Sequence, residues 1–110
     1  MFSEEISYKL LRLIEANPRL SQREVARELG VSLGKVNFCL KALIQKGWLK
    51  ATNFKNSNNK AAYMYLLTRR GIKEKARLAM CFLSVKLEEY ERLRVEIEQI
   101  RDEARRGSSA

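Results

Sequence analysis

The feature that most constrains the fold is a pair of closely spaced helix boundaries in the first half of the chain. Ser21 and Glu24 have the spacing of a capping box, and Gly30 suits the left-handed residue that commonly ends a helix. Ser32 follows almost at once as the cap of a second helix, which Gly47 ends. Two helices joined by so tight a turn predict a helix-turn-helix, although an ordinary helical hairpin has the same pattern.

The flanking segments extend this prediction. Residues 3–16 have an apolar face at helical spacing, and Pro18 ends that helix. Residues 48–54 and 61–67 are rich in aromatic and aliphatic side chains, and the polar turn between them carries a lysine at each end. This pattern predicts a β-hairpin. A basic hairpin directly after a helix-turn-helix indicates the wing of a winged helix, whereas the alternative is a hairpin that only connects two helices.

A long final helix is expected after Thr68, because residues 72–104 contain neither proline nor glycine. The predicted fold is therefore mainly α with a small β-hairpin: a winged helix-turn-helix followed by a long C-terminal coiled-coil helix. We expect a DNA-binding domain over residues 1–68, a dimerisation helix over residues 69–104 and a disordered tail over residues 105–110.

The basic charge of the chain is concentrated in one interval. The formal net charge is +9, and no acidic residue occurs between Glu28 and Glu74, where nine lysines and arginines lie. A basic block within a folded domain attracts phosphates and accelerates association with polyanions. The alternative is a solvated basic surface without a partner.

Several other classes of function are disfavoured. The chain has no histidine, and Cys39 and Cys81 do not form a CxxC pair, so we expect both to be buried packing residues and expect no metal site and no cofactor. With Asp102 as the single aspartate, and no glycine-rich phosphate loop or nucleophile elbow, the sequence does not indicate an enzyme. It shows no signal-peptide core and no apolar run of membrane-spanning length, which predicts a cytoplasmic protein without a membrane partner.

The third helix offers a surface that could enter a major groove. Its expected core side carries Val36, Cys39, Leu40 and Leu43, flanked by Leu33 and Ile44. The candidate DNA-binding residues of this recognition helix are Ser32, Gly34, Lys35, Asn37, Phe38, Lys41 and Gln45.

The chemistry of these residues suits base edges and phosphates. Asparagine and glutamine can pair with adenine, phenylalanine can contact a thymine methyl group, and lysine can hold phosphate or guanine. Gly34 would let the helix approach DNA closely. Phe38 is the most specific indication, and its alternative is packing against the wing or another helix.

Two further groups could contact the DNA backbone. At the start of the second helix these are Ser21, Gln22 and Arg23, for which simple helix capping is the alternative. On the wing, contacts to the backbone or minor groove are expected from Lys55, Asn56, Asn58, Asn59 and Lys60.

The final helix carries a heptad pattern. Position a falls on Ala76, Leu83, Tyr90, Ile97 and Ala104, and position d on Ile72, Ala79, Lys86, Leu93 and Ile100. The pattern predicts a coiled-coil dimer interface made by Leu83, Tyr90, Leu93, Ile97 and Ile100. The alternative is a lone helix with a solvated surface.

The charges beside this seam favour parallel helices. Glu89 and Glu96 occupy position g, and Arg94 and Arg101 occupy position e. In a parallel pair each glutamate faces an arginine of the partner, whereas in an antiparallel pair glutamates would face glutamates.

The sequence also resembles a known family. The residues that carry the resemblance are LSQREVARELGVSLGKVN at 20–37, LKALI at 40–44, KGW at 46–48, YLLT at 65–68 and Gly71. Together with the asparagine-rich turn and the long final helix, they resemble the small MarR-family regulators associated with exopolysaccharide gene clusters. The resemblance extends from Ser3 to about Glu103. It implies a winged helix-turn-helix DNA-binding regulator and, by association, exopolysaccharide target genes. The chain lacks the extra dimerisation helices of full-length MarR proteins, so the resemblance does not imply their ligand pocket.

Together these features predict a transcriptional regulator that binds a pseudo-palindromic site on double-stranded DNA as a homodimer. One alternative is a winged-helix protein-interaction adaptor, which would show no salt-sensitive duplex binding. Another is a sequence-independent nucleic-acid binder, which would show little preference among duplexes. No small-molecule effector is indicated.

Overall fold

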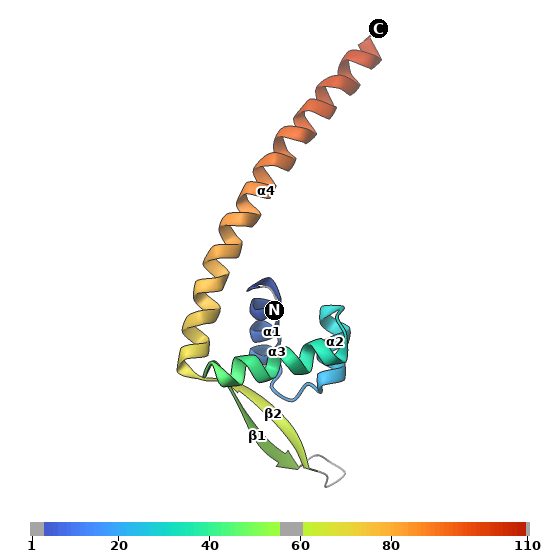
Figure 1. Ribbon diagram of the computed structural model, residues 1–110. Helices are drawn as coiled ribbons and strands as arrows, with labels where there is room; N and C mark the ends of the chain where they lie inside the picture. Colours follow the sequence, from blue (N-terminus) through green and yellow to red (C-terminus); the bar gives the residue numbers. More distant parts are fainter. Residues whose placement is uncertain (1–3, 56–60, 110) are drawn as a thin grey trace. The chain divides into compact units, whose positions relative to one another are not determined.

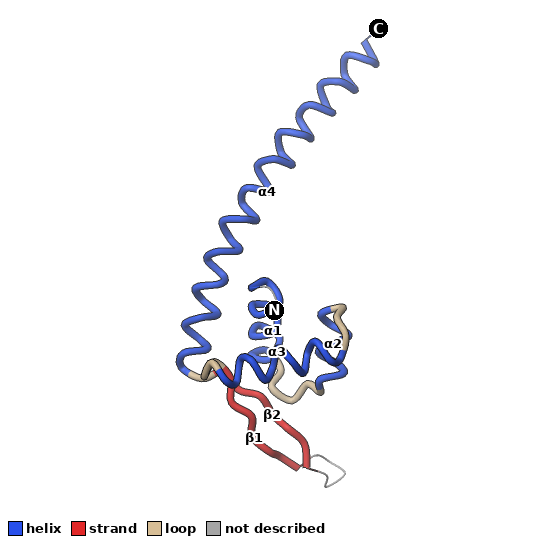
Figure 2. Tube along the Cα trace, in the orientation of Figure 1, coloured by secondary structure: helices blue, strands red, loops and turns tan. Residues whose placement is uncertain are grey.

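The computed structural model describes residues 4–55 and 61–109. Its elements in chain order are α1 (Glu4–Ala16), α2 (Gln22–Leu29), α3 (Leu33–Gln45), β1 (Leu49–Lys55), β2 (Ala61–Leu67) and α4 (Arg69–Ser109). The expected fold class is confirmed: three helices are followed by a two-stranded hairpin and a long helix (Figures 1 and 2). The chain divides into two compact units, residues 1–79 and residues 80–110.

The helix-turn-helix forms through the predicted caps. The side chain of Ser21 accepts a hydrogen bond from the backbone N–H of Glu24 at 3.1 Å, and the Glu24 carboxylate accepts one from the Ser21 backbone, which completes the capping box. Gly30 adopts φ 67°, in the left-handed region that glycine tolerates best. Ser32 then accepts a hydrogen bond from the Lys35 backbone at 3.1 Å and caps α3. The turn between α2 and α3 is therefore encoded locally.

The core of the first unit gathers apolar side chains from the short helices, the hairpin and the start of α4. Its fully buried large side chains are Leu10, Leu11, Ile14, Val36, Cys39, Leu40, Leu43, Leu49 and Leu78. The predicted core side of α3 is confirmed for Val36, Cys39, Leu40 and Leu43, whereas Leu33 and Ile44 are exposed. These two lie at the edges of the apolar stripe, where no neighbouring element covers them fully.

The two cysteines differ in environment. Cys39 is buried, as predicted, and burial raises the pKa of its thiol. The prediction for Cys81 is wrong, because this side chain is exposed on α4. Met80 and Leu83 near it are exposed as well, because this part of α4 lies beyond the first compact unit, which ends at Ala79.

The hairpin is antiparallel, with Leu49 opposite Leu67 and Lys55 opposite Ala61. Its base is joined to the start of α4 by a compact set of hydrogen bonds. The hydroxyl of Thr68 donates to the Gly47 carbonyl at 2.5 Å, and the Thr68 backbone N–H donates to the Trp48 carbonyl at 2.9 Å. Gly71 N–H donates in turn to the Thr68 hydroxyl at 3.1 Å. A Cβ atom on Gly71 would overlap the Trp48 carbonyl oxygen.

The helix α4 has 41 residues and is thus roughly 60 Å long. Its first turns belong to the first compact unit, where Leu78 is buried. From Leu83 to Ser108 every side chain is exposed. The helix continues to Ser109, so residues 105–109 are helical where the sequence predicts a disordered tail. Arg106 in the last turn interacts favourably with the helix dipole, which helps the helix to continue there.

Within residues 4–55 and 61–109, no helix is long and apolar enough to cross a lipid bilayer. The same described residues contain no cluster of three or more side chains suited to hold a metal ion.

Candidate nucleic-acid interface

The outward side of α3 carries most of the predicted recognition residues. Lys35, Lys41 and Gln45 are exposed, and Phe38 exposes 55% of its surface. Gly34 lies on the same side, and a Cβ atom there would have no neighbour within 4 Å. The fold therefore does not require glycine at position 34, and the residue leaves room for another molecule to approach the helix.

Asn37 differs from its neighbours on α3, because it is only half-exposed and is hydrogen-bonded within the protein. Its Nδ2 donates to Oε1 of Gln22 at 3.1 Å, and Nε2 of Gln22 donates to the hydroxyl of Tyr65 at 3.0 Å. These bonds form a polar chain, Asn37–Gln22–Tyr65, that joins α3, α2 and β2. The sequence predicts a DNA-backbone contact for Gln22. In the structure, both the oxygen and the nitrogen of its side-chain amide are hydrogen-bonded within the protein.

The other candidates near the helix starts have local roles as well. The hydroxyls of Ser21 and Ser32 cap α2 and α3, so Ser21 has the capping role that is the alternative to a DNA contact. Arg23 is exposed on the first turn of α2. Of the wing candidates, Asn56, Asn58, Asn59 and Lys60 lie outside the described residues, and Lys55 is the last residue of β1.

Sequence reasoning missed a cleft near the start of α2. Its volume is about 210 Å³, and it is lined by Arg19, Leu20, Ser21, Gln22, Tyr63 and Tyr65. The rings of Tyr63 and Tyr65 stack with centroids 6.5 Å apart, and the Tyr65 N–H donates to the Pro18 carbonyl at 3.2 Å. Alternation along a strand places Tyr63 and Tyr65 on one face of the hairpin, which the sequence could have indicated.

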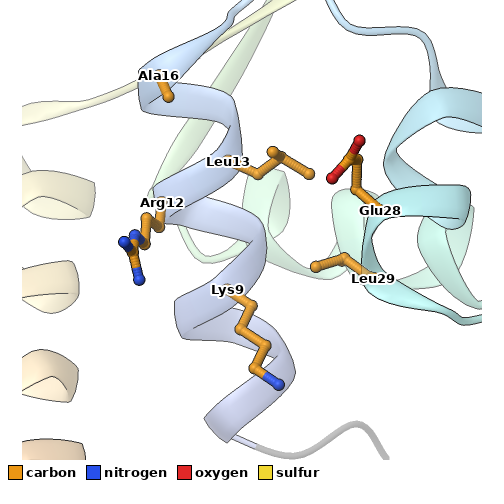
Figure 3. A pocket seen from close by; sticks show the side chains of 6 residues that line it. All are labelled: Lys9, Arg12, Leu13, Ala16, Glu28 and Leu29. Atoms are coloured by element: carbon orange, nitrogen blue, oxygen red, sulfur yellow. The ribbon is translucent and has the colours of Figure 1, made fainter.

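A second hollow, of about 230 Å³, lies between α1 and α2 (Figure 3). Leu13 and Leu29 extend toward each other across it, and Ala16 adds to its apolar lining. The remaining lining residues are Lys9, Arg12 and Glu28, of which none is buried. This hollow offers apolar contact, but its lining provides no buried polar group that would orient a ligand.

In the second unit the predicted seam of α4 is exposed. The exposed fractions lie between 44% and 64% for Leu83, Tyr90, Leu93, Ile97 and Ile100. An isolated helix with an apolar stripe of this kind, interrupted at position d by Lys86, leaves surface that favours a partner.

The charges beside the seam pair within the helix itself. Arg94 contacts Glu91 at 2.6 Å, and Arg101 contacts Glu98 at 3.0 Å. The hydrogen bond from Arg94 lowers the pKa of Glu91. These contacts compete with the pairs that the sequence predicts between Arg94 or Arg101 and a partner's glutamates, so charge alone favours a parallel dimer less than expected.

Gly34→Ala tests the role of the glycine on α3. Alanine should leave stability unchanged or raise it by up to about 1 kcal/mol, because of its higher helix propensity. If DNA approaches this part of the helix, the added methyl group should cost about 1–3 kcal/mol of specific binding, as overpacking does. Thermal melts and duplex titrations measure the two effects separately. Unchanged affinity would show that DNA does not approach Gly34.

Comparison with known proteins connects this arrangement with transcriptional regulators. Residues 3–50 match the family model described as winged helix-turn-helix DNA-binding. The HTH-type transcriptional regulator Ptr1 of Methanocaldococcus jannaschii is 46% identical over 44 residues, which are 40% of this chain and 30% of that protein. The chain thus aligns with less than a third of the length of this curated relative.

Solved structures extend the similarity to more of the chain. A PadR-like transcriptional regulator from Bacillus cereus superposes with a TM-score of 0.71 at 16% identity, over 79% of this chain and 89% of that one. A MarR family protein of Mycobacterium tuberculosis, solved with p-aminosalicylic acid, superposes with a TM-score of 0.60 at 22% identity. The superposition covers 76% of this chain and 61% of that one. The chain carries a winged helix-turn-helix of the kind found in DNA-binding transcriptional regulators.

Proposed function

We propose that this chain is a sequence-specific, double-stranded DNA-binding transcriptional regulator that acts in the cytoplasm as a homodimer. The observation that supports this most is the outward side of α3. It combines an uncrowded glycine, lysines and a half-exposed phenylalanine, opposite a fully buried apolar side.

In this proposal α3 enters the major groove. Phe38 contacts a thymine methyl group, Gln45 and Asn37 pair with base edges, and Lys35 and Lys41 hold phosphate or guanine. Ser21, Arg23 and the cap of α3 at Ser32 lie at helix N-termini, where backbone N–H groups suit phosphates. The wing residues Lys55, Asn56, Asn58, Asn59 and Lys60 contact the backbone or minor groove.

The second part of the proposal is dimerisation through α4. The exposed stripe of Leu83, Tyr90, Leu93, Ile97 and Ile100 would form a parallel coiled coil with a second copy. Two recognition helices would then occupy half-sites about one helical turn apart, so the bound site would be a pseudo-palindrome.

Selection from a pool of random duplexes tests the first part directly. The proposal predicts an enriched pseudo-palindrome that binds much more tightly than scrambled duplex. Enrichment of duplex without any common sequence would favour the sequence-independent binder, and absence of duplex binding would favour the protein-interaction adaptor.

Phe38→Ala should weaken binding to the selected duplex by about 1–3 kcal/mol, the usual value of one good base contact, and relax preference at a thymine. Stability should change little, because Phe38 is not among the buried core residues of α3. Fluorescence anisotropy and thermal melting measure the two effects. A sharp fall in melting temperature with intact base preference would make Phe38 a packing residue.

The resemblance to regulators associated with exopolysaccharide clusters suggests target genes. Sequencing DNA fragments that co-purify with the protein from its own genome tests this suggestion. Fragments that map away from such clusters would contradict it.

A further inference from the structure

The polar chain Asn37–Gln22–Tyr65 is a feature of the interface that neither DNA contact nor core packing explains. Tyr65 is 8% exposed and Gln22 is half-buried, so the hydroxyl and the amide meet at a part-buried position beside the cleft. The hydrogen bonds along the chain, 3.1 and 3.0 Å long, are within the normal range. A hydrogen-bonded chain of this kind restricts the rotation of each member.

We propose that Gln22 and Tyr65 are positioning residues that fix the orientation of the Asn37 amide for contact with a base. This inference rests on the proposed DNA-binding function. Because an amide nitrogen carries two hydrogens, Asn37 keeps one donor hydrogen and its carbonyl acceptor after it donates to Gln22. One donor and one acceptor are what a bidentate contact with adenine requires.

The polar chain also connects the recognition helix to the hairpin. Tyr65 lies in β2, directly opposite Ala51 of β1, and its backbone N–H is bonded to Pro18 before α2. The backbone of Tyr65 is therefore bonded to the segment before α2 and lies beside β1, while Asn37 lies at the other end of the polar chain. Orientation imposed in this way lowers the entropy that Asn37 would lose on binding a base.

Tyr65→Phe removes the end of the polar chain with little change of shape, and Tyr63→Phe is the matched control. Tyr63 is 62% exposed on the same strand and stacks on Tyr65, but its hydroxyl is not part of the polar chain. In the free protein, Tyr65→Phe should shift the side-chain amide NMR signals of Gln22 and Asn37, whereas Tyr63→Phe should leave them in place. Gln22→Ala serves as a second variant that should also shift the Asn37 signals.

On the duplex enriched by selection, Tyr65→Phe should lower discrimination at the base pair contacted by Asn37 by about 2- to 10-fold, the range of one neutral hydrogen bond. Binding to scrambled duplex should be unchanged. In an Asn37→Ala background, Tyr65→Phe should have no further effect on discrimination, which a double-mutant cycle measures.

The positioning role would be overturned if Tyr65→Phe left the amide signals of Gln22 and Asn37 in place. It would also be overturned if Tyr65→Phe reduced discrimination equally in the wild-type and Asn37→Ala backgrounds. A wild-type protein with no base preference would instead overturn the proposed function, and this result is distinct because it needs no variant.

Discussion

Gly71→Ala should lower the free energy of unfolding by about 1–3 kcal/mol, the usual cost of forcing a methyl group into a packed site. Helix propensity alone predicts the opposite sign, a gain of up to about 1 kcal/mol for alanine inside a helix. The structure decides between them, because the new Cβ would overlap the Trp48 carbonyl oxygen. That oxygen already accepts the Thr68 N–H at 2.9 Å, so it cannot retreat without weakening the bond.

Urea and thermal unfolding measure this effect, and Gly34→Ala is the matched control. It makes the same change within a helix, at a position where the Cβ has open space. We expect a lower midpoint for Gly71→Ala and an equal or higher one for Gly34→Ala. Equal behaviour of the two variants would show that α4 does not begin against Trp48.

Ile97→Lys should weaken self-association by at least about tenfold, equivalent to about 1.4 kcal/mol, because it places a charge in the apolar seam. Val95→Lys is the control. Ile97 and Val95 are 44% and 43% exposed in the chain, and they differ in that Val95 lies off the seam. Sedimentation equilibrium at micromolar concentration should therefore give a dimer for wild type and Val95→Lys, and mostly monomer for Ile97→Lys. Wild-type protein that stays monomeric would contradict the dimer.

The direction of the helices needs a separate readout, because Arg94 and Arg101 have glutamate partners within their own helix. Ala104→Cys in a Cys81→Ser background provides it. Parallel helices bring the two copies of residue 104 together, so mild oxidation should form a disulfide between them. Antiparallel helices would hold these residues far apart and leave the thiols free.

Local patterns were sufficient to predict the helix-turn-helix. The capping box at Ser21 and Glu24, the left-handed Gly30 and the cap at Ser32 all depend on residues within a few positions, and each lies where the sequence places it. The hairpin was also predictable from local sequence, because two apolar segments, residues 48–54 and 61–67, flank a polar turn.

The environment of Asn37 and the buried side of α4 could not be predicted, because both depend on contacts between elements distant in sequence. A helical wheel puts Asn37 on the outward side of α3, but cannot show that Gln22 and Tyr65 approach it from α2 and β2. The heptad pattern likewise assigns Ala76 and Ala79 to a seam and gives no role to Leu78. Leu78 is buried instead, and by helical spacing it lies on the same side of α4 as Gly71, which packs closely against the Trp48 backbone.

The salt dependence of binding tests most directly whether the basic winged helix binds duplex DNA. Each phosphate neutralised should contribute about −0.9 to the slope of log affinity against log salt concentration. Lys55→Ala combined with Lys60→Ala removes two wing lysines, and Lys9→Ala with Arg12→Ala removes the same charge from α1, outside the acid-free interval.

The measurement is a set of fluorescence anisotropy titrations of duplex DNA between low and physiological salt. Wild-type protein should bind tightly at low salt with a steep negative slope, and the wing variant should flatten that slope by about 0.9 for each phosphate that it no longer neutralises. The α1 variant should keep the wild-type slope. Absence of duplex binding at low salt, or affinity that does not change with salt, would contradict DNA binding by the winged helix.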